Sequence, residues 1–136
     1  MKITRHQDWP LRFEAFCAAR RAIPFVWGAN DCSTFAADCV CALTGTDPAP
    51  PSLRLHKTAK QALRAIKRHG GLCSIATAAL GQPVPSSRAN IGDVVLTKIG
   101  GREALAVCNG ATALGPGPQG LQAVPMQFNQ LAWRIG

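Results

Sequence analysis

The chain has 136 residues, of which 47% are apolar, and it carries a formal net charge of +8. This length fits one domain, and the apolar content excludes a disordered chain. Its apolar stretches are far shorter than the ~20 residues that span a bilayer. The N-terminal segment lacks the apolar core of a signal peptide. We therefore expect a soluble protein made in the cytoplasm, with no signal peptide and no transmembrane segment.

The excess of Lys and Arg fits either a partner with an acidic surface or ordinary solubility charge. The sequence contains no Tyr, and no aromatic residue interrupts its basic run. Aromatic side chains are the platforms on which nucleic-acid bases stack, so their absence beside the basic residues argues against base recognition. We expect no specific nucleic-acid partner.

Two helices are predicted in the first third of the chain. The first begins at Asp8, whose side chain suits a helix cap, and one of its faces is apolar. The second covers about 32–44 and is apolar on almost every side, which predicts a buried central helix. Asn30 and Asp31 offer its N-terminal cap, and Gly45 offers its C-terminal stop.

The middle of the chain predicts two more helices. An amphipathic helix is predicted over 56–69 and a short helix over about 72–80, each ended by glycine. The apolar face of the longer helix consists of Ala59, Ala62, Leu63 and Ile66. Its water-facing side consists of Lys57, Lys60, Arg64, Lys67 and Arg68. A loop rich in Pro and Ser is expected over 82–92.

The last third of the chain has the pattern of strands. Short apolar segments alternate with turn residues, among them Asn109-Gly110, which is a strong hairpin signal. The predicted strands are 93–97, 104–108, 111–114, 121–124 and 131–135, and a loop is predicted over 115–120.

Helices followed by strands predict an α+β fold. We expect N-terminal helices, with a buried central helix, packed on a small antiparallel C-terminal sheet or half-barrel. The chain then forms a single domain over 1–136, with its helical part over about 8–80 and its sheet part over about 92–136.

Six cysteines are present, without the paired CxxC spacing of a metal site. Buried free cysteines behave as small hydrophobes, and we expect this of Cys17, Cys39, Cys41 and Cys73. The sequence therefore predicts no metal and no cofactor. An alternative, a metal or iron–sulfur site on Cys32, Cys39 and Cys41, is left open by the spacing.

The segment 25–35 carries the most chemical information. Cys32 stands in the first turn of the predicted central helix, where the helix dipole and unpaired N–H groups favour a thiolate and can bind an oxyanion. Gly28 would let a substrate approach the backbone. A cysteine hydrolase needs these features. The alternative is that Asn30 and Asp31 only cap the helix and that Cys32 is one more small buried residue.

This segment resembles the nucleophile motif of the NlpC-type cell-wall peptidases, a branch of the papain-like fold. The matching residues are Phe25, Trp27, Gly28, Asp31, Cys32 and Ser33. Ile91–Val95 resembles the Gly-Asp strand of that family, and Asn109-Gly110 matches the turn after the next strand. The resemblance covers about residues 24–45 and 91–115.

The resemblance implies a papain-like, NlpC-like fold and a set of site residues. The catalytic positions would be Cys32, as the nucleophile, with Asp31 and Ser33 beside it. The substrate-binding positions would be Trp27, Gly28 and Asn30.

The chain also resembles a group of short phage-encoded proteins related to these peptidases. The shared segments here are Pro24–Cys32, Thr44–Asp47 and Ala132–Arg134. Such proteins resemble tail-tip components, so the resemblance implies assembly into a virion tail.

One element of the peptidase pattern is missing. The family's general base is a His at the start of the strand after Gly-Asp, but here that position falls near Glu103-Ala104. The polar residue that orients the His would fall near Ala113-Leu114. Without a base, a cysteine of ordinary pKa is only a few per cent thiolate at pH 7. The candidates for a substitute base are His6, His56, His69 and Glu103.

Two functions follow from this pattern. The first is a phage tail-tip or baseplate component, mainly structural, on a degenerate NlpC-like cysteine-peptidase scaffold whose partners are other tail-tip or hub proteins. The alternative is an active peptidoglycan endopeptidase that uses Cys32 on the host cell wall. The missing base favours the first, because a scaffold alone does not imply its activity.

Overall fold

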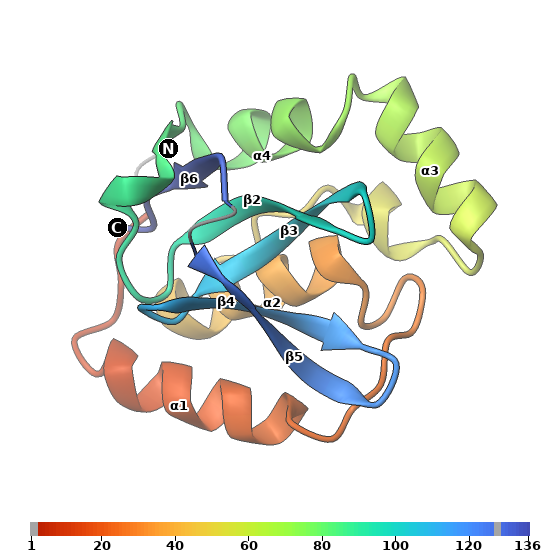
Figure 1. The fold of residues 1–136 in the computed structure, drawn as a ribbon. Helices are drawn as coiled ribbons and strands as arrows, with labels where there is room; N and C mark the ends of the chain where they lie inside the picture. The colour runs from red at the N-terminus through yellow and green to blue at the C-terminus, as the bar shows by residue number, and fades with distance from the viewer. Residues whose placement is uncertain (1–2, 127–128) are drawn as a thin grey trace.

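The computed structural model describes residues 3–126 and 129–136, which form helices followed by a sheet (Figure 1). The helices are α1 (Trp9–Arg20), α2 (Cys32–Thr44), α3 (Ala59–Arg68) and α4 (Leu72–Leu80), with 3₁₀ turns η1 (Pro51–Arg54) and η2 (Ser86–Arg88). The strands are β1 (Val84–Pro85), β2 (Val94–Ile99), β3 (Arg102–Cys108), β4 (Thr112–Gly117), β5 (Gly120–Pro125) and β6 (Leu131–Trp133). The expected α+β class is confirmed. In this described part of the chain, no helix combines the length and the apolar character that crossing a membrane requires.

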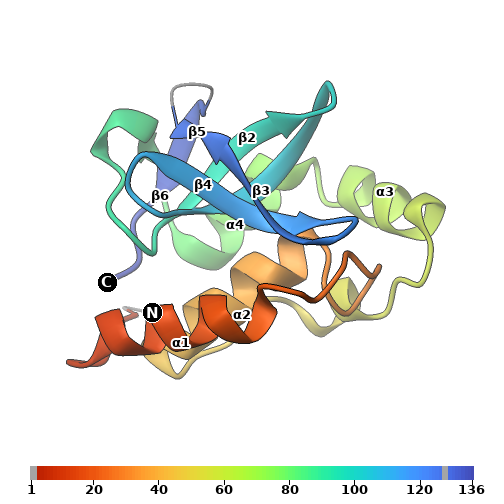
Figure 2. The same ribbon diagram turned by 60° about the horizontal axis from the view of Figure 1, so that its bottom comes forward.

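The strands form one antiparallel sheet in the order β1-β6-β2-β3-β4-β5. β2 and β3 pair along their whole length, whereas β3 and β4 pair only at Val107 and Cys108 of β3. The β4–β5 hairpin therefore diverges from β2 and β3, as both views show (Figures 1 and 2). This divergence leaves the first half of β3 with one edge that β4 does not cover.

The central helix α2 lies between the sheet and α1, as expected (Figure 2). Its buried side chains belong to the main core together with alternate residues of the strands. This core includes Phe35, Val40, Leu43, Val94, Leu96, Leu105, Val107 and Trp133. A smaller cluster covers the other face of the sheet and consists of Val95, Ala106, Cys108, Ala113 and Ala132. The first half of β2 is thus buried on both faces, which explains the apolar run Val94–Leu96.

The ends of α2 are confirmed and those of α3 are not. Gly45 ends α2 in the left-handed conformation, with φ of 81°. The helix expected from residue 56 begins only at Ala59, because the Thr58 side chain caps it by accepting a hydrogen bond from the Gln61 N–H. Leu63, expected on the buried face, is 44% exposed.

Asp8 occupies the position before α1, as expected, but its side chain does not cap the helix. Asp8 makes no capping hydrogen bond, and its carboxylate instead accepts from Arg12 Nε at 2.7 Å, one turn along the helix. This exposed pair keeps the pKa of Asp8 below its ordinary value, chiefly through the hydrogen bond from Arg12.

Part of the loop expected over 115–120 is strand. Residues 115–117 extend β4 and pair with β5, so that only Pro118 and Gln119 form the turn. Pro116 has no N–H to donate, but β3 does not pair with β4 at that position, so no bond of that ladder is lost. The loop expected over 82–92 likewise contains β1, which pairs with β6.

Candidate functional site

Asp31 fixes the start of α2 through a complete capping box. Its Oδ1 accepts from the Thr34 N–H at 2.9 Å, and the Thr34 hydroxyl accepts from the Asp31 N–H at 2.8 Å. The second carboxylate oxygen accepts from the Gly28 N–H at 2.9 Å, which ties the preceding loop to the helix. Cys32 therefore occupies the first position of the helix, as the sequence predicts.

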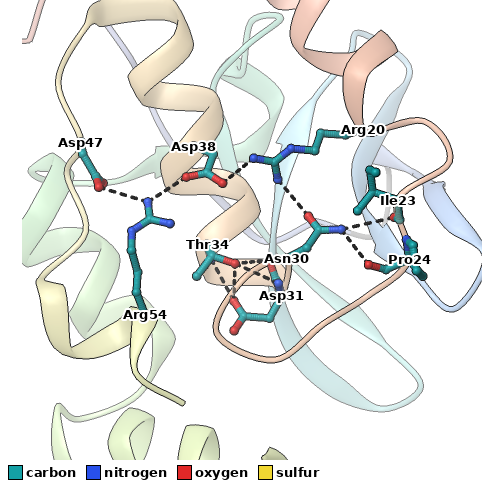
Figure 3. Close-up of polar contacts among 9 residues, drawn as sticks. All are labelled: Arg20, Ile23, Pro24, Asn30, Asp31, Thr34, Asp38, Asp47 and Arg54. Atoms are coloured by element: carbon teal, nitrogen blue, oxygen red, sulfur yellow. Dashed lines mark hydrogen bonds and ion pairs between the residues drawn. The ribbon is translucent and has the colours of Figure 1, made fainter. Parts of the chain in front are cut away.

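Asn30 serves the loop itself rather than an open site. It is 4% exposed, and its Nδ2 donates to the carbonyl oxygens of Ile23 and Pro24 while its Oδ1 accepts from Arg20 (Figure 3). Both ends of the amide are thus occupied within the chain. Asn30, expected to bind substrate, instead holds the loop that leads from α1 to Cys32.

An ion-pair chain links three segments around this loop. Asp38 of α2 accepts from Arg20 at 2.6 Å and from Arg54 at 2.8 Å, and Arg54 also reaches Asp47 at 3.1 Å (Figure 3). The side chains of Arg20, Asp38 and Arg54 are partly buried. The network attaches α1 and the end of η1 to the central helix, and it brings residues 54–56 beside the Cys32 loop.

Gly28 has a structural reason to be glycine. Its φ is +79°, and a Cβ there would overlap the carbonyl oxygen of His56. The close approach that the sequence predicts at Gly28 is therefore made by the chain's own backbone. This contact holds His56 against the loop that precedes Cys32.

The Cys32 thiol is not in an activating environment. Cys32 retains some exposed surface, but burial raises the pKa of the thiol above its ordinary value, and the charge of Asp31 adds to the rise. Hydrogen bonds from the Leu105 backbone and from Ser33 act in the opposite direction without reversing it. The Ser33 Oγ lies 3.9 Å from Sγ. At neutral pH the thiol is protonated, so the thiolate expected from the helix start is not the resting form.

The strand that would supply a catalytic His presents apolar groups to this site. Ala104 and Leu105 of β3 are buried, and Glu103 is exposed opposite Lys98 of β2. Ala113 and Leu114 of β4 are buried and apolar as well. No imidazole or carboxylate of these positions can accept the proton of the thiol.

The three histidines lie in different places. His6 lies at the far end of α2, with its ring beside Gly45, and His69 is exposed at the end of α3. His56 instead shares a small cavity with Cys32 and Trp27. Its Nε2 is buried and has no hydrogen-bond partner. His56 is one of the candidate substitute bases in the sequence, but no local sequence signal predicts that it lies beside Cys32.

The cavities at the site are small and apolar. The one lined by Cys32, Ser33 and His56 measures about 20 Å³, which holds about one water molecule. A second, of about 30 Å³, lies on the other side of Ser33 and is lined by side chains of α2 and α4 together with Leu105. Binding pockets for small ligands are typically about 300–1,000 Å³. Neither cavity can admit a peptide without rearrangement.

The Trp27 ring packs edge-on against Phe25, with ring centroids 4.6 Å apart. Trp27 is one of the residues that line the Cys32 cavity. Within residues 3–126 and 129–136, no three His, Cys, Asp or Glu side chains are grouped closely enough to hold a metal ion. The trio of Cys32, Cys39 and Cys41 is therefore not assembled as a metal site.

The aspartate of the Gly92-Asp93 segment has a structural role. Asp93 is 1% exposed, and its carboxylate accepts from Arg5 at 2.9 Å, from the Ile135 N–H at 2.9 Å and from the Asn90 N–H at 2.8 Å. This carboxylate ties segments near both ends of the described chain to the start of β2.

Comparison with known proteins gives one family. The family model that matches is described as Domain of unknown function (DUF6950), and it covers residues 4–135. No curated protein matches the chain.

Proposed function

The chain belongs to the DUF6950 family, and from the motif resemblance of its sequence together with the geometry at Cys32 we propose that it is a structural component of a phage tail tip or baseplate, built on an NlpC-like peptidase scaffold whose cysteine site is inactive. Its partners are other tail-tip or hub proteins, and its place is the assembled virion tail. The proposal joins the motif resemblance of the sequence to the chemistry of the Cys32 site.

The single observation that carries the inactive site is the surroundings of the thiol. Burial raises the pKa of Cys32, and the facing residues of β3 are apolar. A thiol that stays protonated at pH 7 is a poor nucleophile, and general-base help is typically worth 10²–10⁴-fold in rate. The remaining polar side chains, Asp31 and Asn30, already form hydrogen bonds with the backbone of the helix and of the loop before it.

The positions of the motif residues support the scaffold part of the proposal. Cys32 begins a buried helix, Gly92-Asp93 precedes β2, and Asn109-Gly110 lies between β3 and β4. These are the places that the resemblance to the NlpC-type peptidases requires for its three motifs.

A second candidate function, an active peptidoglycan endopeptidase, is favoured by one observation. His56 Nε2 is buried without a partner, and His56 lines the same cavity as Cys32. In that reading His56 accepts the thiol proton, and the thiolate adds to a peptide carbonyl whose oxyanion binds at the start of α2. The protonated His56 then donates to the leaving amine, and water hydrolyses the thioester. The cavity would have to open for the peptide to enter.

The experiment that separates the two candidates is the pH dependence of Cys32 alkylation by iodoacetamide. Because the chain has six free cysteines, the modification is followed at Cys32 by mass spectrometry, with Cys32→Ala as the blank. We expect slow alkylation with an apparent pKa above the ordinary value of about 8.5, unchanged in His56→Gln. Fast alkylation below pH 7 that is lost in His56→Gln would refute the inactive site and favour the endopeptidase, whose peptidoglycan cleavage would then be assayed directly.

Complementation tests the tail-tip assignment itself. In a phage that encodes the chain, deletion of its gene should yield particles with defective tail tips, and the chain should be detected in purified virions. We expect Cys32→Ala to restore infectivity fully. Normal tails after deletion would contradict the structural role, and failure of Cys32→Ala to complement would favour the enzyme.

A further inference from the structure

A separate feature of the molecule is the concentration of its positive charge. Between Asp47 and Asp93 the sequence has no acidic residue. The basic residues of this interval are Arg54, Lys57, Lys60, Arg64, Lys67, Arg68 and Arg88. This interval therefore contributes +7 to the net charge of +8, whereas the rest of the chain, with eight basic and seven acidic residues, contributes +1.

Five of these cations form one surface, which we call the α3 stripe. The α3 stripe consists of Lys57, Lys60, Arg64, Lys67 and Arg68. All five side chains are exposed, and none forms an ion pair with the described residues. On the helix, Lys60 and Arg68 are about 12 Å apart along the axis, given a rise of 1.5 Å per residue.

The stripe is placed for contact with another molecule. α3 lies at the periphery of the protein in both views, away from the sheet (Figures 1 and 2). Its small residues Ala62 and Ala65 are buried, so the helix packs on the body with one narrow face. Lys60, Arg64 and Arg68 follow one another at four-residue intervals, where like charges repel. Arg54, by contrast, is neutralised by Asp38 and Asp47.

The positive charge of the stripe favours an anionic partner, and the apolar residues around it indicate which class of anionic molecule fits. A helix that inserts into a membrane needs a free apolar face, but that face of α3 is occupied by the protein. Protein interfaces are depleted in Lys and have an apolar centre, whereas the stripe itself consists of three lysines and two arginines, with the exposed Leu55 and Leu63 next to it in the sequence. A row of cations without an apolar centre suits a regular line of phosphates.

We propose that the α3 stripe binds the sugar–phosphate backbone of double-stranded DNA, independently of base sequence. An exposed α-helix about 10–12 Å across fits the DNA major groove, about 12 Å wide. The stripe has no aromatic side chain to stack on a base, and the neighbouring Gln61 uses its side-chain oxygen to accept from the Lys57 N–H, so we expect the stripe to contact phosphate. This surface is distinct from the Cys32 site and does not depend on the proposed tail-tip role.

The salt dependence of binding gives the quantitative test. Five phosphate contacts predict that the logarithm of the binding constant falls with the logarithm of salt concentration with a slope of about −4.5. Binding should then weaken about 500-fold between about 50 and 200 mM salt. The measurement is fluorescence anisotropy of a short labelled duplex with the full chain, repeated with a second duplex of unrelated sequence.

Two triple variants of equal net charge isolate the stripe. The stripe variant is Lys60→Gln, Arg64→Gln and Lys67→Gln. The control variant is Arg88→Gln, Lys98→Gln and Arg102→Gln, which removes exposed cations outside α3. We expect the stripe variant to lower the slope by about three, since each lost phosphate contact removes about one, and the control variant to leave it near the parent value. Equal thermal midpoints show that both variants are folded.

Several results would overturn the proposal. An equal loss of DNA affinity in the stripe variant and the control variant would mean that net charge alone drives binding. Displacement of the duplex by poly-L-glutamate at equal charge would indicate an acidic protein partner, and preference for vesicles of anionic lipid would indicate a membrane surface. A strong difference between the two duplex sequences would contradict backbone binding.

Discussion

Removing the carboxylate of Asp31 should destabilise the whole domain, because this side chain is a buried cap with several partners. Asp31→Ala deletes the acceptor for the Thr34 and Gly28 N–H groups, and the site is 4% exposed. Loss of an N-cap costs about 1 kcal/mol, and buried donors left without partners add roughly 1–3 kcal/mol. A total near 3 kcal/mol lowers the melting temperature of a domain this size by about 10 °C.

The assay is thermal and urea unfolding, with Asp8→Ala as the matched control. Asp8 also precedes a helix, but it is exposed and makes no capping bond, so its removal should leave the midpoint nearly unchanged. Asp31→Asn keeps one acceptor oxygen for the Thr34 N–H but turns an amide NH₂ toward the Gly28 N–H, so it should recover only part of the lost stability. Because the charge of Asp31 raises the pKa of Cys32, Asp31→Asn should also lower that pKa and speed alkylation. Equal destabilisation by Asp31→Ala and Asp8→Ala would refute the capping argument.

Two further predictions concern packing and pH. Gly28→Ala should cost about 1–3 kcal/mol more than Gly110→Ala in urea unfolding, because both glycines have positive φ but only at Gly28 would a Cβ overlap the His56 carbonyl oxygen; equal losses would contradict this overlap. Burial raises the pKa of the Cys39 thiol in the folded protein. Above the ordinary thiol pKa of about 8.5, the unfolded chain therefore ionises this thiol while the folded protein keeps it protonated, and this difference destabilises the fold as pH rises. The free energy of unfolding should thus fall above that pH, and Cys39→Ala should flatten the fall while lowering stability at neutral pH; a pH-independent parent protein would show that the thiol does not ionise on unfolding.

The elements that the sequence predicts well are those whose signals are local. α2 could be bounded because Asp31 caps its first turn and Gly45 adopts the left-handed conformation at its end, each acting within a few residues. The hairpin at Asn109-Gly110 could be predicted in the same way, since this dipeptide favours a tight turn independently of distant residues. The α+β order followed from the change of apolar period along the chain.

Local signals failed where several residues compete for the same role. Thr58 begins α3, although the basic and apolar pattern extends back to residue 56. Gly115 and Gly117 resemble loop residues, yet they lie in β4 because pairing with β5 satisfies their backbone. A strand can thus include such residues when a neighbouring strand supplies the hydrogen bonds.

The amino-acid sequence by itself determined the helix that begins at Cys32, the antiparallel C-terminal strands and the absence of a His on β3. Only the tertiary structure decided what surrounds Cys32. His56 reaches its cavity because the Arg54 ion pairs and the close contact at Gly28 fold a distant segment onto the loop. The thiol pKa rises because that packing excludes water, and burial depends on contacts between segments far apart in the chain.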